Sequence, residues 1–111
     1  MSALPYADNL RVDCAKIVDY LLSPSNGRGK ADFFMRYGFT AEAWEVLAES
    51  LMVQARRFPV VSAVDSSYGT RYSVDGEVDT PSGRKPFPRI RTVWILEPGS
   101  TGPRLITAHP I

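Results

Sequence analysis

The chain has 111 residues, of which 44% are hydrophobic and 23% are charged, and this size and composition predict one folded domain over residues 1–111 and exclude a disordered chain. The chain has thirteen basic and twelve acidic residues. This near balance argues against tight nonspecific binding to nucleic acid, because proteins that bind in this way usually have an excess of basic residues. With one cysteine and one histidine we expect no metal, and we also expect no cofactor. No apolar segment approaches the roughly 20 residues of a membrane span, and no signal peptide is recognisable, so we expect a cytoplasmic protein.

The first half of the chain has the periodicity of helices. Apolar residues at spacings of three and four predict a first helix with Cys14 buried on its apolar face. Turn-forming residues follow at positions 23–29, Gly38 is expected to end the second helix, and Thr40 is expected to cap the third. The predicted helices cover residues 9–22, 30–37 and 40–57.

Beyond the third helix the hydrophobic period changes from about 3.6 to 2, which indicates strands. The predicted strands cover residues 60–64, 70–78, 90–96 and 104–108. Their short connections favour an antiparallel meander, so the expected fold is α+β, with three N-terminal helices packed on a four-stranded antiparallel meander sheet. The helices could cover either the face with Thr92 and Trp94 or the face with Val93 and Ile95.

Basic and polar side chains recur along the last three predicted strands. Arg89 and Arg91 lie on one face because strand residues alternate, and hairpins could bring Arg71, Thr107 and His109 beside them. Arginine binds phosphate bidentately, and histidine titrates near neutral pH. Together these residues could stabilise and protonate a phosphodiester during cleavage.

Three further residues are candidate substrate contacts. Lys30 begins a predicted helix, where a cation opposes the helix dipole, and this suggests a phosphate or another partner, although a solvated lysine is the simpler interpretation. Tyr68 or Tyr72 could stack a base. The arginines have a simpler interpretation too, because pairing with Asp75 or Glu77 would keep an exposed sheet soluble.

The order of several short segments resembles a bacterial family of small proteins and toxin C-terminal domains of uncharacterised function. The segments are YLLSP at 20–24, GKADFF at 29–34, YGFT at 37–40, YGTRY at 68–72, RTVW at 91–94 and PRLITAHP at 103–110. That family is similar to the barnase, EndoU, colicin E5 and D, and RelE-like assemblage of nucleases. Members of the assemblage place helices before a four-stranded antiparallel sheet and cut RNA without metal.

The resemblance implies a ribonuclease toxin that acts on RNA, with a small cognate antitoxin or immunity protein as partner. Lys30, Arg71 and Arg91 match the recurring basic positions of the family. Thr107 and His109 match its C-terminal polar motif.

The sequence departs from the family at one of these positions: the family more often has tyrosine where this chain has His109. If this position only holds RNA, the general base would be Tyr68 or a carboxylate such as Glu77.

Two other functions remain open. One is a non-catalytic protein-binding module, of the antitoxin, immunity or accessory kind, that uses the exposed sheet face; near-neutral charge fits this interpretation. The other is a small-molecule enzyme on the same polar face, for which the sequence offers no cofactor-binding pattern.

Overall fold

A computed structural model describes residues 2–23 and 29–111 and confirms the predicted α+β fold. The helical elements are η1 (Ala7–Asn9), α1 (Cys14–Lys16), η2 (Ile17–Leu21), α2 (Lys30–Arg36) and α3 (Trp44–Arg57). The strands are β1 (Val60–Ser66), β2 (Gly69–Glu77), β3 (Arg89–Leu96) and β4 (Arg104–Pro110). They pair antiparallel in the order β1-β2-β3-β4, which is the predicted meander.

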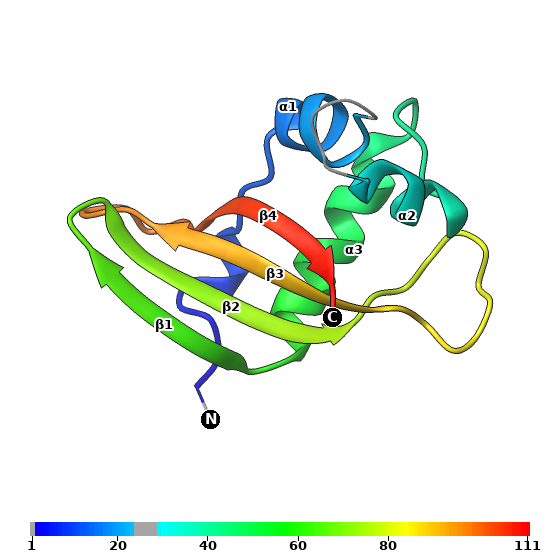
Figure 1. Ribbon diagram of the computed structural model, residues 1–111. Coiled ribbons are helices and arrows are strands. Elements are labelled where there is room, and N and C mark those ends of the chain that lie inside the picture. Colours follow the sequence, from blue (N-terminus) through cyan, green and yellow to red (C-terminus); the bar gives the residue numbers. More distant parts are fainter. Residues whose placement is uncertain (1, 24–28) are drawn as a thin grey trace.

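The sheet has one covered and one open face. Helix α3 lies behind the sheet in Figure 1, while α1 and α2 lie together on the side of β4. In the part of the chain that the structure describes, no helix covers the opposite face, which we call the outer face. Because β4 borders α1 and α2, side chains from these helical segments can reach the end of the outer face that lies beside β4.

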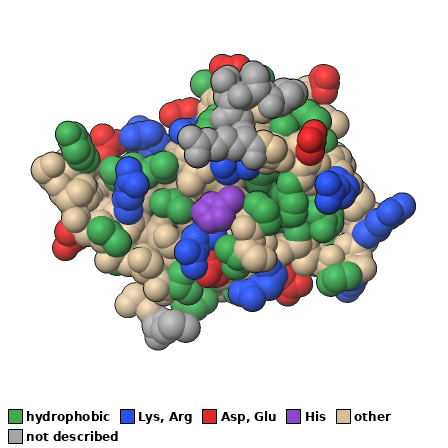
Figure 2. All heavy atoms as spheres, in the orientation of Figure 1, with side chains coloured by type: hydrophobic (Ala, Val, Ile, Leu, Met, Phe, Trp, Pro, Cys, Tyr) green, Lys and Arg blue, Asp and Glu red, His purple; other side chains and the backbone are tan. Residues whose placement is uncertain are grey.

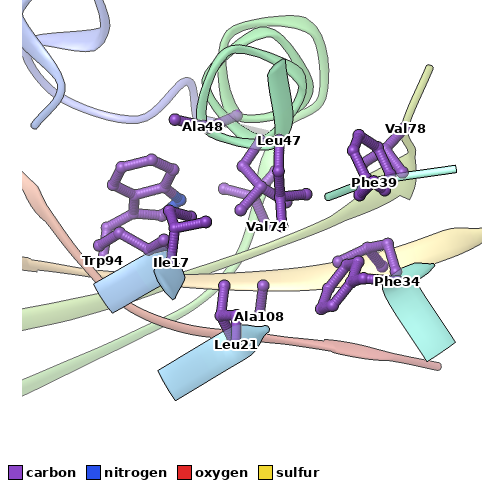
Figure 3. Close-up of a cluster of buried hydrophobic side chains, with 14 of the residues drawn as sticks. Ile17, Leu21, Phe34, Phe39, Leu47, Ala48, Val74, Val78, Trp94 and Ala108 are labelled. Carbon is purple, nitrogen blue, oxygen red and sulfur yellow. The ribbon is translucent and has the colours of Figure 1, made fainter. Parts of the chain in front are cut away.

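The core lies between the helices and the inner face of the sheet (Figure 3). Its largest fully buried side chains include Ile17, Phe34 and Leu47 from the helical half and Val74, Ile90, Trp94 and Leu105 from the strands. Thr92 and Trp94 therefore belong to the covered face, which settles the alternative that alternation alone left open. Arg91 and Val93 belong to the outer face.

One buried polar side chain, Gln54 of α3, ties the helix to the sheet. Its Nε2 donates hydrogen bonds of 2.9 Å to the carbonyl oxygens of both Val74 and Ile90. Its Oε1 accepts a bond of 2.8 Å from the Thr92 hydroxyl, which in turn accepts one of 2.8 Å from Trp94 Nε1. Each member of this buried network is bonded, so the network fixes α3 on β2 and β3 without leaving an unpaired polar atom.

The predicted first helix over 9–22 is wrong in its first half. Arg11 is extended: its N–H donates to the carbonyl of Pro103 at 2.8 Å, and its carbonyl accepts from the N–H of Leu105 at 2.9 Å. These bonds to the start of β4 replace the helical ones, so the helix begins only at Cys14. Cys14 was expected to be buried and is exposed, because it precedes the buried part of the helical segment.

The other element limits are close to prediction. Gly38 follows α2 with a φ of 98°, as expected for a left-handed helix stop. Thr40 accepts a hydrogen bond of 3.2 Å from the N–H of Ala43 in the turn before α3, and the helix itself begins at Trp44. Most of the turn predicted at 23–29 lies outside the described residues.

Strand β4 carries one residue more than β3 over their paired length. Trp94 pairs with Leu105, but the preceding Val93 pairs with Thr107, so Ile106 is an extra residue between the two pairs. Such a β-bulge reverses which face the following side chains occupy. Beyond the bulge, each side chain of β4 therefore lies on the face opposite to the one that regular alternation would predict.

Candidate functional site

The bulge in β4 brings the single histidine to the outer face. Without it, the pairing of Trp94 with Leu105 would continue until His109 stood opposite Ile90, on the covered face. With it, His109 pairs with Arg91, which pairs in turn with Asp75 of β2. We call Asp75, Arg91 and His109, neighbours across three strands, the Arg91 row.

Arg91 is oriented by a bidentate ion pair with Asp75. Arg91 Nε lies 2.7 Å from Asp75 Oδ1, and Arg91 Nη2 lies 2.8 Å from Asp75 Oδ2. The pair lowers the pKa of Asp75 and raises that of Arg91, so both groups stay charged at neutral pH. Of the five N–H donors on a guanidinium, three remain for a ligand.

The surroundings of His109 favour its neutral imidazole. Its side chain is half-buried, and burial is the main cause that lowers its pKa below the ordinary value of 6.5. The positive charges of Lys30 and Arg91 lower the pKa further, against a smaller opposing effect of Asp75. The neutral imidazole therefore predominates at pH 7, and it has a nitrogen that can accept a proton.

A tyrosine with two lysines lies next to the Arg91 row. The Tyr20 hydroxyl is 3.5 Å from both Thr107 Oγ1 and Lys30 Nζ, and its ring lies 5.0 Å from Lys16 Nζ and 5.3 Å from Lys30 Nζ. The contact with Thr107 is the main cause that lowers the pKa of Tyr20, followed by the bond and charge of Lys30 and the charge of Lys16, against an opposing effect of burial. Both 3.5 Å contacts are long for hydrogen bonds, so the hydroxyl is not firmly held by either neighbour.

Lys30 joins these two groups into one site. Lys30 and His109 line the same pocket, of about 250 Å³, together with Gly29, Phe33 and Pro110. Figure 2 shows the histidine near the centre of this face, with lysine or arginine side chains above and below it and a hydrophobic area beside it. We call Tyr20, Lys30, Asp75, Arg91, Thr107 and His109 the candidate site. It offers a neutral base, a hydroxyl with a lowered pKa, and cations that could bind a phosphate.

Two predicted arginines lie on the same face outside this group. Arg89 pairs with Glu77 at the end of β2, two residues along β3 from Arg91. Arg71 is four residues from Asp75 along β2, which corresponds to about 13 Å. Arg71 is therefore not brought together with Arg91 and His109.

The two predicted tyrosines lie away from the site. Tyr68 is in the turn between β1 and β2 and is 77% exposed. Tyr72 faces the helices and packs against the core. Of the two bases considered as substitutes for His109, Tyr68 is thus distant, while Glu77 stands on the outer face opposite Arg89.

Sequence reasoning did not include Tyr20 and Lys16 among the site residues. Their spacing of four places them on one side of a helical segment, which was a usable signal. Nothing in the sequence, however, indicated that this side meets Thr107, 87 residues further along the chain.

Residues 2–23 and 29–111 offer neither a metal site nor a membrane span. They contain no group of three or more His, Cys, Asp or Glu side chains that could hold a metal ion. Their helices include none with the length and apolar character needed to span a bilayer.

The fold and the site define a small α+β protein that carries a cationic site with a histidine and a tyrosine on the open face of its sheet. The chain belongs to the family described as a domain of unknown function, DUF6883, whose model matches residues 3–111. No curated protein matches it. Among solved structures it is similar to a chain of a contact-dependent growth inhibition toxin–immunity protein complex from Klebsiella pneumoniae 342, with a TM-score of 0.72 and 20% identity over 95% of this chain and 96% of that chain. At this identity the similarity shows a shared fold.

Proposed function

We propose that this protein is a ribonuclease toxin domain of a toxin–antitoxin or polymorphic-toxin system, which cleaves RNA phosphodiesters without a metal. The observation that carries the proposal is the position of His109, a neutral base that stands between the cations of Arg91 and Lys30. The fold shared with a chain of a toxin–immunity complex supports a role in a toxin system.

The first chemical step assigned to the site is attack by a ribose 2′-hydroxyl on the adjacent phosphorus. His109 takes the proton of this hydroxyl as the bond between the 2′-oxygen and phosphorus forms. A base role fits His109 better than the acid role expected from sequence, because burial and two neighbouring cations favour the unprotonated imidazole. No other histidine exists in the chain to share the two roles.

Protonation of the leaving group is assigned to Tyr20. As the bond between phosphorus and the 5′-oxygen breaks, the Tyr20 hydroxyl gives its proton to that oxygen, which leaves a 2′,3′-cyclic phosphate and a 5′-hydroxyl. Lys30 and Lys16 favour the resulting phenolate because they place positive charge beside the ring. The Thr107 hydroxyl, 3.5 Å from the Tyr20 oxygen, can donate a hydrogen bond to the phenolate.

Arg91 and Lys30 supply the positive charge that the transition state requires. The three N–H donors of Arg91 that Asp75 leaves unused can bind the nonbridging phosphate oxygens, and the Asp75 pair holds the guanidinium in place before RNA arrives. Preorganised donors of this kind stabilise developing negative charge without reorganisation. Arg89 and Arg71, further along the outer face, are assigned to neighbouring phosphates of the strand.

A small cognate antitoxin or immunity protein is the proposed partner. A toxin that acts in the cell that makes it must be held inactive, and covering the candidate site would achieve this. Arg91 and Lys30 favour a partner that presents carboxylates, since their charges are not neutralised by Asp75 alone.

Regulated expression in bacteria tests the proposal. Native protein is expected to stop growth and fragment cellular RNA, whereas His109→Gln, shown to be folded by its circular dichroism and melting temperature, is expected to do neither. Undiminished growth and intact RNA with folded native protein would contradict the proposal.

A non-catalytic protein-binding module is the second candidate, and the edge of the sheet favours it. Strand β1 has an edge that pairs with no other strand, where Val60 N–H donates to the carbonyl of Ser2, and it exposes Val61 and Val64, of which Val64 is 58% exposed. Exposed apolar residues on an edge strand are typical of protein interfaces. Co-purification of a stoichiometric partner without damage to RNA would favour this function, and release of cyclic phosphate ends would exclude it.

A further inference from the structure

The pocket beside the imidazole of His109 has a composition that phosphate chemistry does not explain. It is lined by Gly29, by the apolar residues Phe33 and Pro110, and by the polar residues Lys30 and His109. A phosphate needs donors, which Lys30 can supply, but the side chains of Phe33 and Pro110 provide none. The mixture of flat apolar walls and one cation instead matches a flat heterocycle joined to a phosphate.

The ring of Phe33 is held in place by other aromatic rings. Its centroid lies 5.3 Å from that of Phe34, with an angle of 83° between the planes, and 5.2 Å from that of Tyr37, with an angle of 55°. Phe34 is fully buried, so this arrangement anchors Phe33 to the core while leaving it half-exposed at the pocket. A stacking surface that is fixed in this way costs little conformational entropy when a ligand binds.

The size of the pocket limits what can fill it. At about 250 Å³ it is smaller than the sites of roughly 300–1,000 Å³ that hold drug-sized ligands. One nucleobase is a ligand of suitable size. Lys30 lies three residues before Phe33, close to one turn of α2, so a cation for the attached phosphate stands beside the ring.

We propose that this pocket binds the base of a nucleotide that flanks the scissile phosphate, stacked on Phe33. The inference rests on the proposed ribonuclease function and adds to it a residue that sets substrate preference. Because the Phe33 side chain offers a ring and no hydrogen-bond donor or acceptor, the preference follows stacking strength and favours a purine over a pyrimidine. Tyr68 and Tyr72, the stacking residues expected from sequence, lie elsewhere on the molecule.

A cycle that combines a protein change with a substrate change tests the pocket. The substrates are DNA oligonucleotides with one ribonucleotide, in which the base on each side of the cleavable bond is adenine or is absent. Phe33→Leu keeps an apolar side chain and removes the ring. With the complete substrate it is expected to lower kcat/KM by about 10- to 100-fold, because stacking of one base is lost.

The abasic substrate separates stacking from a structural role of Phe33. When the base that the pocket binds is removed from the substrate, kcat/KM of native protein should fall by a similar factor. With this abasic substrate, Phe33→Leu should lower kcat/KM little further. Phe33→Trp should retain the native rate. Met35→Ala, an exposed change on the same helix, should cleave both substrates at the native rate.

A second measurement does not depend on cleavage. An oligonucleotide with 2-aminopurine beside a 2′-deoxy linkage cannot be cut there, and its fluorescence should be quenched on binding to native protein and not on binding to Phe33→Leu. If native protein cleaves RNA and Phe33→Leu slows the abasic and complete substrates equally, the pocket proposal is wrong and the ribonuclease proposal stands. If native protein neither cleaves nor binds RNA, both are wrong.

Discussion

Two rows of residues cross the outer face of the same sheet, and only one of them is part of the candidate site. The Arg91 row joins Asp75, Arg91 and His109; the other, four residues along β2, joins Arg71, Ile95 and Arg104. The β-bulge of β4 lies between the two rows. An arginine on an open sheet face is thus not informative by itself, and what surrounds it decides what it can do.

Two features separate the rows. The bulge gives the Arg91 row a histidine on the outer face, and the helical segments beside β4 add Tyr20 and Lys30. In the other row Arg104 pairs with Glu97 at 3.5 Å.

Replacement of His109 by glutamine should have the largest effect. Loss of the general base is expected to slow single-turnover cleavage of RNA by about 10²- to 10⁴-fold. Quenched-flow or manual sampling at saturating protein measures this rate. Equal rates for the variant and native protein would remove His109 from the mechanism.

Arg91→Ala should slow the same step by about 10²- to 10³-fold, because donors aimed at the phosphate are lost. Arg91→Lys should recover only part of the rate, since an ammonium cannot replace the paired guanidinium. The matched control is Arg71→Ala, on the same face in the other row, for which a rate close to native is expected at saturating protein. If Arg71→Ala is slowed as much as Arg91→Ala, the distinction between the rows is wrong.

Tyr20→Phe removes the proposed acid and keeps the ring under Lys16 and Lys30. We expect cleavage slowed by about 100-fold. A substrate with a better leaving group, such as a nitrophenyl ester at the 5′ side, should be cleaved by Tyr20→Phe and native protein at similar rates. An undiminished defect on that substrate would assign Tyr20 to binding or folding.

The pKa of His109 should respond to the other charges of the candidate site. Native protein is expected to reach full activity as pH rises through a pKa below 6.5, because the neutral imidazole is the active form. Lys30→Met removes a positive charge that lowers this pKa, so the acid limb should move to higher pH. NMR titration of the single histidine measures the shift directly, with Lys85→Met as a control that should leave it unchanged.

Arg71→Ala should have the smallest effect, and only on binding. Loss of one phosphate contact is expected to reduce the slope of log affinity against log salt by about 0.7 for a single strand. Filter binding of a long RNA and of a dinucleotide distinguishes the two rows, since only the long RNA reaches Arg71. An unchanged slope would remove Arg71 from the RNA path.

Much of the fold could be predicted because its signals are local. The change of period beyond the third helix indicated where strands begin, and Gly38 indicated where α2 ends. The first helix was predicted too long, because the bonds that hold Arg11 extended come from β4, far along the chain.

The site was only partly predictable for a similar reason. Alternation placed Arg89 and Arg91 on one face, but it could not decide the face of His109, which depends on the bulge at Ile106. That position has no glycine or proline to mark a bulge. The neighbour relation of Tyr20 and Thr107 is tertiary and leaves no pattern in the sequence.

The candidate site is proposed to cleave RNA with groups of the protein alone. Purified native protein should be incubated with end-labelled RNA in EDTA, and the product ends should be analysed. We predict 2′,3′-cyclic phosphate and 5′-hydroxyl ends, formed by native protein and not by folded His109→Gln. Intact RNA with native protein, or equal cleavage by the two proteins, would contradict this account.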